Sequence, residues 1–335
     1  MISHDRQFMD EISEWVHDIA EQKLVRYKGN YSAFEKQREE NFQRAAAAYK
    51  NQQKEVKALQ VFVNKFRSVA SKAAQAQSKL KQLEKMDILP KPIRAKKPFR
   101  FQIPEPPRGG QKAVALEGVH MAYGDLVVYE NLDLTVERGE QTVLVGPNGS
   151  GKSTLIKILA GVIEPKRGGR VLGHNAKIGY FSQHRSQSLE PENTVLDEVM
   201  RSAGGSEIRE EGARGILGTF LFKKDDIFKK TKVLSGGEKS RLNLVKFLVD
   251  PPNLLLMDEP TTHLDMHAVE SLILALQNYA GTLVFISHDV HFIRKLATKV
   301  LHVTGGGVSA YPGPYDYFLE KTGATKGGRA ALTAS

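Results

Sequence analysis

The chain contains no cysteine and no long apolar run, and each absence excludes a class of protein. Without cysteine there is neither a disulfide framework nor a cysteine-ligated metal, which fits a reducing compartment. No stretch approaches the roughly 18–20 apolar residues of a membrane span, and the first residues lack the apolar core of a signal peptide. With 335 residues, 41% of them hydrophobic, we expect a soluble, cytoplasmic protein of about two domains.

Glycine and proline are both missing from residues 30–89, a segment rich in alanine, glutamine, lysine, arginine and glutamate. These residue types favour helix, and apolar side chains such as Leu59 and Val63 recur there at steps of three and four. The pattern predicts an antiparallel helical hairpin over 39–89, with Ser71 as the N-cap of its second helix. One long helix is the alternative that the apolar spacing leaves open.

The positive charge of the chain is concentrated around this segment. The whole sequence has 48 basic and 38 acidic residues and a net charge of +10. Residues 36–100 alone contain 17 lysines and arginines against five acidic residues, a net charge of +12, so the rest of the chain is close to neutral. Such a basic helical segment favours a polyanionic partner such as nucleic acid, although a solvated helical face has the same composition.

The rest of the sequence divides into a linker, an α/β region and a tail. Six prolines lie between positions 90 and 107, and they predict an extended linker over 90–112. Over residues 113–320, short apolar runs alternate with turn residues and helical patterns, which is typical of an α/β domain. Residues 321–335 are mostly small and polar, and they predict a disordered tail.

An internal repeat relates the two ends of the chain. At an offset of 284 positions the first residues align with the last without gaps, and ten of the 33 aligned pairs are identical where chance gives about two. We therefore expect residues 1–38 to be the end of a domain whose complete copy spans 113–320, and the front of that first domain to be missing. The identical residues of the first copy are Ile2, Ser3, His4, Asp5, Phe8, Val16, Tyr27, Gly29, Tyr31 and Phe34.

Residues 146–154 read Gly-Pro-Asn-Gly-Ser-Gly-Lys-Ser-Thr, follow an apolar run and precede a helical pattern. This is the P-loop in its strand–loop–helix context, where backbone N–H groups and a helix N-terminus converge on phosphate. Lys152 is then expected to reach the β- and γ-phosphates of ATP, and Ser153 to ligate Mg²⁺. A plain glycine-rich turn is the alternative interpretation. The other residues expected to bind the nucleotide here are Gly146, Asn148, Gly149, Gly151 and Thr154.

A second apolar run, residues 254–257, ends in Asp258 and Glu259. A buried strand that delivers a carboxylate beside a P-loop is the Walker B arrangement, in which Asp258 is expected to bind Mg²⁺. Glu259 would lie nearest the attacking water and act as its general base or polarise it. On its own this pattern equally fits an ordinary strand end.

Further motifs follow the order that they have in ABC ATPases. Residues 234–238, Leu-Ser-Gly-Gly-Glu, closely resemble the ABC signature motif, and Gln183 resembles the Q-loop glutamine. Residues 260–265 resemble the D-loop, His288 the switch histidine, and Tyr123 the aromatic residue that stacks on adenine. A surface amide, a loop histidine and a core tyrosine would each explain one of these residues alone, but not the ordered set.

The resemblance covers residues 113–320 and implies an α/β fold: a P-loop NTPase of ABC type with helical and antiparallel β subdomains, preceded by the hairpin. In ABC proteins two such domains meet head to tail around two ATP molecules. Ser235, Gly236 and Gly237 would then contact the γ-phosphate of a nucleotide held by another domain. The resemblance assigns Mg²⁺ to Ser153, Gln183 and Asp258, and catalysis to Gln183, Glu259 and His288.

The hairpin narrows the resemblance to the ABC-F family of ribosome-associated ATPases. Residues 259–265, Glu-Pro-Thr-Thr-His-Leu-Asp, are similar to that family's Glu-Pro-Thr-Asn-His-Leu-Asp, with Thr262 in place of the usual asparagine. A basic hairpin between two ABC domains is similar to that family's interdomain linker, so the resemblance implies rRNA and tRNA of the ribosome as partners. The residues that would face RNA phosphate are Lys65, Arg67, Lys72, Lys79 and Lys81.

Other interpretations share part of these features. The nucleotide-binding subunit of an ABC transporter would have every motif of 113–320, but it leaves the hairpin and the repeat unexplained. An ATP-binding regulatory fragment without turnover fits the missing first P-loop, and DNA-repair ABC ATPases carry far longer coiled coils inside the domain. With one P-loop, this chain would close only by pairing with its missing half or with a second copy, and the sequence leaves its own turnover open.

Overall fold

The computed structural model describes residues 6–20, 23–68, 70–92, 101, 103–182, 189–204, 208–262 and 264–323. Residues 1–5 of the repeat, Gln183 and residues 324–335 of the expected tail lie outside the described residues. The chain divides into two units, Met1–Lys97 and Pro98–Ser335, which are described separately. No helix in the described part of the chain combines the length and the apolar character needed to cross a membrane.

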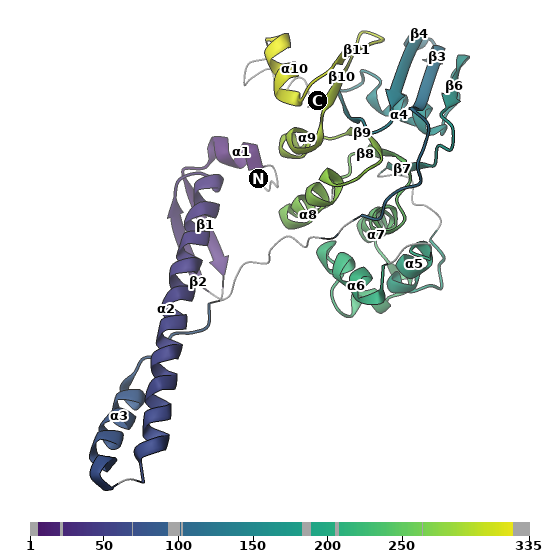
Figure 1. Ribbon diagram of the computed structural model, residues 1–335. Helices are drawn as coiled ribbons and strands as arrows, with labels where there is room; N and C mark the ends of the chain where they lie inside the picture. Colours follow the sequence, from purple (N-terminus) through teal and green to yellow (C-terminus); the bar gives the residue numbers. More distant parts are fainter. Residues whose placement is uncertain are drawn as a thin grey trace. The chain divides into compact units, whose positions relative to one another are not determined.

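Unit 1 is a small α/β element that continues into a long helical hairpin (Figure 1). Asn30 caps the first hairpin helix by accepting a hydrogen bond from the Ala33 N–H at 3.0 Å, and this helix begins at Tyr31 rather than at residue 39. The predicted hairpin is confirmed, since a second helix packs back along the first. The elements are α1 (Arg6–Ile12), β1 (Trp15–Ala20), β2 (Lys23–Lys28), α2 (Tyr31–Phe66), a 3₁₀ turn (Ala70–Lys72) and α3 (Ala73–Lys85).

The hairpin is held together by a short apolar contact and by one glutamine. Leu59 and Val63 of α2 and Ala76 of α3 are buried where the two helices pack. The Gln52 side chain accepts a hydrogen bond from the Leu89 N–H at 2.9 Å, and it donates a second hydrogen bond to the Asp87 carbonyl. The contacts of Gln52 attach the segment that follows α3 to the middle of α2.

The turn between the two helices differs from the prediction. Ser71 lies within the 3₁₀ turn, and the position before α3 is Lys72, whose side chain makes no capping hydrogen bond. The chain reverses through tight i→i+3 bonds, so the Ser71 hydroxyl stands one residue too early to cap α3. The prediction of Ser71 as an N-cap is therefore wrong.

Unit 2 contains two sheets and a group of helices. Its strands are β3 (Lys112–Tyr123), β4 (Leu126–Glu137), β5 (Gln141–Val145), β6 (Arg167–Leu172), β7 (Ile178–Ser182), β8 (Leu254–Asp258), β9 (Thr282–Ile286), β10 (Lys299–Thr304) and β11 (Gly307–Tyr311). Its helices are α4 (Lys152–Ala160), α5 (Val195–Ser202), α6 (Glu210–Thr219), α7 (Gly236–Val249), α8 (Met266–Gln277), α9 (Val290–Leu296) and α10 (Tyr315–Thr322), with 3₁₀ turns at Asp226–Phe228 and Thr231–Val233.

The larger sheet has six strands in the order β11–β10–β5–β9–β8–β7, and all its neighbours are parallel except β10 and β11. A three-stranded antiparallel sheet of order β4–β3–β6 stands beside it, and α5, α6 and α7 form a separate helical part (Figure 1). Strands β8 and β9 are almost continuously buried, as expected for parallel strands covered on both faces. This arrangement confirms the predicted α/β fold, with its antiparallel β and helical subdomains and a helical hairpin before them.

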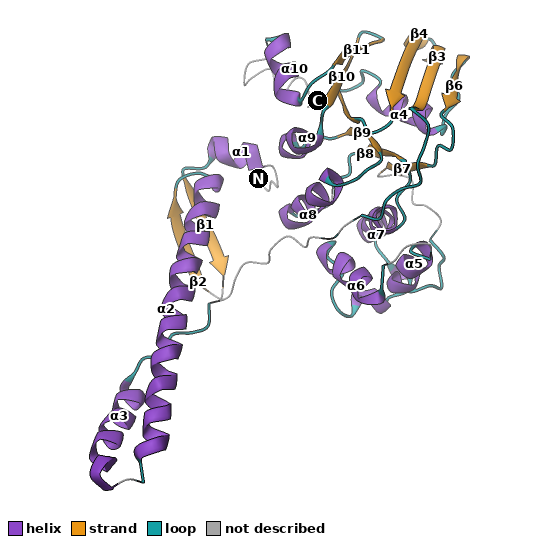
Figure 2. Ribbon diagram, viewed as in Figure 1, coloured by secondary structure: helices purple, strands orange, loops and turns teal. Residues whose placement is uncertain are grey.

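The two ends of the chain contain the same elements at the offset of 284. The order α1–β1–β2–α2 at one end is repeated as α9–β10–β11–α10 at the other (Figure 2), and each register pair of β10 with β11 has its counterpart in β1 with β2. Side-chain packing repeats as well, because the ring of Phe34 lies 5.0 Å from Tyr27 and the ring of Phe318 lies 5.0 Å from Tyr311, both edge to face. The repeat seen in the sequence is thus a repeat of backbone and core packing.

A buried ion pair joins α5 to α7 in the helical part of unit 2. The Glu198 carboxylate is 0% exposed and lies 2.8 Å from Lys246 Nζ and 2.9 Å from the Arg201 guanidinium. Asn193 donates a further hydrogen bond at 2.9 Å. Desolvation opposes the ionisation of Glu198, but the hydrogen bonds from Lys246 and Asn193 outweigh it and lower its pKa. The carboxylate therefore stays ionised and links the two helices.

Replacing Glu198 with glutamine is expected to destabilise the protein by about 3–5 kcal/mol, because Lys246 would remain buried without its counter-charge. Because the pKa of Glu198 is lowered in the folded protein, the stability that its ionised carboxylate contributes should also be lost as the pH falls through this lowered pKa. Chemical denaturation measures both effects. The control is Glu192→Gln, which removes a carboxylate that contacts Lys230 and Lys232 but is 62% exposed. A loss at Glu198 no larger than at Glu192 would contradict the prediction.

Candidate nucleotide site

The predicted P-loop connects β5 to α4 and needs glycine at three positions. Gly146, Gly149 and Gly151 have φ angles of +150°, +78° and +104°, in the range that favours glycine. At Gly146 a Cβ would lie 2.2 Å from the carbonyl oxygen of Val303 on the neighbouring strand β10. The loop can therefore turn tightly and aim the backbone N–H groups at the start of α4 toward one point, as an anion site requires.

Lys152 is the first residue of α4, and its side chain folds back over the loop. The residue is buried, and Nζ donates to the carbonyls of Gly146 at 2.7 Å and Pro147 at 2.9 Å. Desolvation lowers the pKa of Lys152 below its ordinary value, although the charges of Glu259 and Asp258 act against this. A buried ammonium at the start of a helix is a strong attractant for the oxygens of a phosphate.

The predicted Walker B strand β8 ends beside β9, and the predicted switch histidine, His288, stands two residues beyond the end of β9. Asp258 pairs with Ile286, and Glu259 follows with φ +54°, a left-handed conformation that is uncommon for a residue with a side chain. The Glu259 N–H donates to the Ile286 carbonyl at 3.0 Å. Its carboxylate Oε2 accepts the His288 N–H at 3.3 Å, and Oε1 lies 3.3 Å from His288 Nε2. The structure thus brings Glu259 and His288 together.

The pKa of Glu259 is raised above its ordinary value. Desolvation is the main cause, and Asp258 adds to it, while the charge and the N–H of His288 and the charge of Lys152 act in the opposite direction. Lys152, Asp258 and His288 thus all act electrostatically on Glu259, and the four residues lie at or beyond the carboxyl ends of β5, β8 and β9, where parallel sheets hold their ligands. A carboxylate with a raised pKa is a better proton acceptor near neutral pH.

Ser153 and Asp258 offer the hard oxygen ligands that Mg²⁺ prefers. Ser153 is exposed at the second position of α4, and Asp258 is half-buried at the end of β8. Among the described residues, no group of three His, Cys, Asp or Glu could hold a metal on its own. The set therefore fits a Mg²⁺ that takes further ligands from nucleotide phosphates and water. Gln183 would follow β7, whose last residue Ser182 pairs with Asp258, but it lies outside the described residues.

The domain that contains this site matches a known protein family. Residues 129–262, which include the P-loop, the signature residues and the Walker B strand, match a family model described as ABC transporter. The chain contains an ABC ATPase domain. Residues 17–101 match a second model that has the same description, and this match includes the helical hairpin.

Relatives of the ABC ATPase domain extend over nearly the whole chain. This chain is 38% identical over 322 residues to the putative ATP-binding protein YdiF of Bacillus subtilis (strain 168). The alignment covers 96% of this chain and 50% of that protein. It is 38% identical over 320 residues to the probable ATP-binding protein YheS of Escherichia coli (strain K12), with 96% and 50% covered. For ABC transporter F family member 2 of Arabidopsis thaliana the identity is 35% over 324 residues, with 96% and 47% covered. The chain spans about half the length of these relatives.

A solved structure has the same fold as the ABC ATPase domain. The ATP binding subunit of an ABC transporter superposes with a TM-score of 0.51 and 22% sequence identity, covering 66% of this chain and 95% of that one. A similarity at this level of identity shows the fold alone. In this fold the neighbouring strands β5, β9 and β8 position the cluster around Lys152 and Glu259.

The signature residues of the ABC ATPase domain stand at the start of α7. The Ser235 side chain accepts the Glu238 N–H at 3.3 Å, and the Ser235 N–H donates to Glu238 Oε2 at 2.8 Å, so the two residues form a capping box. Ser235 and Gly236 are exposed and Gly237 is half-buried, on the helical part of the domain. The described contacts do not bring them into the cluster around Lys152.

The remaining predicted nucleotide contacts of the ABC ATPase domain are accessible. Tyr123, the last residue of β3, is half exposed and can present its ring to a flat ligand. Asn148 is exposed on the loop, and Thr154 is half-buried in the first turn of α4. The motifs in the sequence do not include Tyr129 of β4, whose hydroxyl donates to the carbonyl of Gly151, the loop residue before α4. A tyrosine in a strand pattern looks like any core aromatic residue, so no sequence signal distinguishes it.

Proposed function

We propose that the chain is part of an ABC-F type protein of the cytoplasm that binds and hydrolyses ATP and acts on the ribosome in translation. The observation that carries this proposal is the order of its parts: a helix–strand–strand–helix unit that repeats the end of the ABC ATPase domain, then a basic helical hairpin, then the ABC ATPase domain itself. The relative named ABC transporter F family member 2 is similar across 96% of this chain, which includes the hairpin. Closure of two ABC domains on ATP would position the hairpin near rRNA and tRNA.

Exposed apolar residues in unit 1 support a second ABC domain. Ile12 and Ile19 are 59% and 80% exposed, whereas Leu296 and Val303, their counterparts in the repeat, are 2% and 0% exposed. The counterparts are covered because β10 pairs with β5 inside the sheet, while β1 pairs only with β2 among the described residues. Apolar area of this extent is unfavourable in water. We infer that residues 1–38 complete a first ABC domain, whose central strand would pair with β1.

The site residues have separate tasks in the proposed reaction. The P-loop and the start of α4 would hold the phosphates, and Lys152 would turn from the loop carbonyls to the β- and γ-phosphate oxygens. Ser153, Gln183 and Asp258 would hold Mg²⁺, which neutralises charge on the phosphates when bound. Glu259 would accept a proton from the attacking water, which its raised pKa favours, and His288 would hold the carboxylate in place.

The two sides of the proposed clamp contribute different contacts. Tyr123 would stack on the adenine of the nucleotide that Lys152 binds. Ser235, Gly236 and Gly237 would contact the γ-phosphate of a nucleotide bound to the other domain, either the first ABC domain of the full-length protein or a second copy of this chain. ATP turnover would therefore require that partner, and release of the γ-phosphate would open the clamp.

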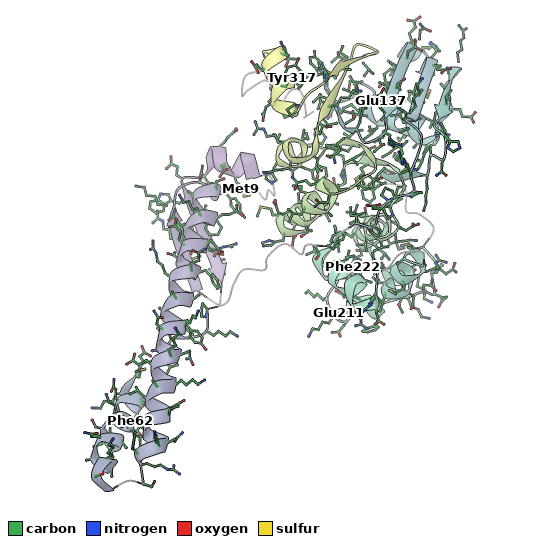
Figure 3. All side chains as sticks on the ribbon, in the orientation of Figure 1. Met9, Phe62, Glu137, Glu211, Phe222 and Tyr317 are labelled. Atoms are coloured by element: carbon green, nitrogen blue, oxygen red, sulfur yellow. The ribbon has the colours of Figure 1, made fainter. Side chains whose placement is uncertain are left out.

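The end of the hairpin has the properties of an RNA-contacting surface. Lys72 Nζ lies 4.4 Å from the centroid of the Phe66 ring. Nearby on α2, a shallow hollow of about 490 Å³ is lined by Lys54, Lys57, Ala58, Val61 and Phe62, of which Phe62 is marked in Figure 3. Lysines beside aromatic and apolar groups suit contacts with both phosphate and base. The five predicted RNA-facing residues, all exposed, are Lys65, Arg67, Lys72, Lys79 and Lys81.

Neutralising the end of the hairpin is expected to weaken ribosome binding. Replacing Lys65, Arg67 and Lys72 together with glutamine removes three positive charges from the exposed turn region. Each contact with phosphate releases counterions, so we expect ribosome affinity to fall roughly tenfold to hundredfold and to depend less steeply on salt. Co-sedimentation with ribosomes in ATP at two salt concentrations measures this, with Glu259→Gln present to slow hydrolysis and keep the closed state populated.

The control for this experiment replaces Lys223, Lys224 and Lys295 with glutamine, since these lysines are exposed on unit 2 and the change in net charge is the same. Equal losses in both triple variants would attribute binding to net charge and remove the hairpin from the proposal. The ribosome role would fail if the chain, joined to a first ABC domain, does not sediment with ribosomes in ATP. Co-purification with a membrane protein would then favour a transporter subunit.

A further inference from the structure

Tyr129 lies against the P-loop from the side of the antiparallel sheet. The residue is fully buried in β4, and its hydroxyl donates to the Gly151 carbonyl at 2.9 Å. A Cβ on Gly151 would come within 2.8 Å of the Tyr129 hydroxyl oxygen and within 2.7 Å of Val128 Cγ1. The tyrosine therefore packs directly on the backbone of the residue that precedes α4.

The Gly151 carbonyl belongs to the same peptide plane as the N–H of Lys152. This carbonyl also accepts the Leu155 N–H at 2.8 Å, the first backbone bond of α4. In a trans peptide, the carbonyl and the following N–H point in opposite directions. A hydrogen bond that holds the carbonyl toward β4 therefore directs the Lys152 N–H away from β4, into the loop where the other P-loop donors converge.

We propose that Tyr129 is a positioning residue for the phosphate site. Its hydroxyl fixes the Gly151–Lys152 peptide so that the Lys152 N–H is preorganised to donate to the diphosphate of a nucleotide. The inference rests on the proposal that this loop binds a nucleotide. It adds Tyr129, which lies outside the P-loop motif, to the residues of the site. A buried hydroxyl is unfavourable unless it is hydrogen-bonded, so phenylalanine would fill the same space without this function.

The hydroxyl of Tyr129 remains a donor over the whole useful pH range. Burial raises the pKa of Tyr129 well above its ordinary value, so the phenol does not ionise under assay conditions. The effect of the residue on nucleotide binding should therefore be independent of pH between about 6 and 9, unlike the effect of a group that titrates in that range.

The chain contains a matched control in Tyr279. This residue is also buried, its hydroxyl donates to the carbonyl of Pro252, and burial raises its pKa in the same way. Pro252 precedes β8, so this bond lies at the amino ends of the strands, whereas the P-loop follows the carboxyl end of β5. The two tyrosines make the same kind of hydrogen bond at opposite ends of the parallel strands.

The experiment compares Tyr129→Phe with Tyr279→Phe in the full chain. Calorimetry measures the affinity for ADP with Mg²⁺ and, by competition, for adenosine, well below the melting temperature of either variant. Both variants are expected to lose one buried hydrogen bond and to melt roughly 2–5 °C lower. Only Tyr129→Phe should bind ADP about 5–20-fold more weakly, and its adenosine affinity should stay unchanged because adenosine has no phosphate.

Equal ADP affinity in Tyr129→Phe and the unchanged protein would overturn the inference and leave the proposed function intact. A loss of ADP affinity in Tyr279→Phe of the same size would also overturn it, because the effect would then follow stability alone. Parallel losses for ADP and adenosine would show a general disturbance of the site rather than phosphate positioning, and would contradict it too. Absence of ADP binding by the unchanged protein would refute the proposed nucleotide site and this inference together.

Discussion

Glu259→Gln is expected to lower the rate of ATP hydrolysis by about 10²–10⁴-fold while changing ATP affinity by about threefold at most. The amide has the size of the carboxylate but cannot accept the proton of the attacking water. In the protein, desolvation raises the pKa of Glu259 and the His288 N–H holds its Oε2 at 3.3 Å, so the group is placed to act as a base. Single-turnover hydrolysis, at protein concentrations that allow two copies to pair, measures the rate.

Glu270 provides the control for this substitution. Its Oε2 lies 3.1 Å from His291 Nε2, so it forms a second glutamate–histidine contact, between α8 and α9 and outside the cluster around Lys152. Glu270→Gln should leave the hydrolysis rate within about twofold of the unchanged protein. If the two substitutions lowered the rate equally, or if Glu259→Gln kept full activity, Glu259 would not be the general base.

Gly146→Ala is expected to weaken ATP binding by about 10²-fold and to lower the free energy of unfolding by about 2–4 kcal/mol. The new Cβ would lie 2.2 Å from the Val303 carbonyl oxygen, which is backbone and can move only with β10, and φ at this position is +150°. The P-loop must therefore shift, and Lys152 loses the Gly146 carbonyl that it now contacts. Denaturant unfolding and nucleotide titration measure the two effects.

The opposite sign is expected for Gly218→Ala in α6, where a Cβ would meet nothing within 4 Å. Alanine in a helix loses less backbone entropy on folding than glycine, so this variant should be more stable by about 0.5–1 kcal/mol. Its nucleotide affinity should not change. If Gly146→Ala were tolerated as well as Gly218→Ala, the close approach of β10 to the loop would not limit the structure.

The parts of the fold that the sequence predicted are those that depend on local chemistry. The strand before the P-loop, the carboxylates at the end of β8 and the glycine-free hairpin follow from apolar runs, turn residues and helix-forming composition. These signals act over a few neighbouring residues, and tertiary contacts reinforce them. The repeat was visible because identical residues occupy equivalent places in two copies of one packing unit.

The parts that the sequence did not predict depend on contacts between distant segments. The hydrogen bond from Tyr129 to Gly151 exists only once β4 packs on the loop, and nothing in the residues around Tyr129 indicates it. The position of Ser71 failed as a cap because the length of the turn, rather than the residue type, decides which residue precedes α3. The start of α2 at Tyr31 was missed for a similar reason, since the repeat placed a domain boundary inside a continuous helix.

The continuity of α2 has a mechanical consequence. The helix begins directly after β2, and its base is fixed by Phe34, which is buried against Tyr27. The whole helix has 36 residues without interruption, and at 1.5 Å per residue it forms a rod of about 54 Å. A rotation of roughly 10° at the base would carry the far end through about 9 Å, nearly the width of a helix. Small rearrangements beside β1 and β2 would thus be amplified at the lysines of the turn, as by a lever.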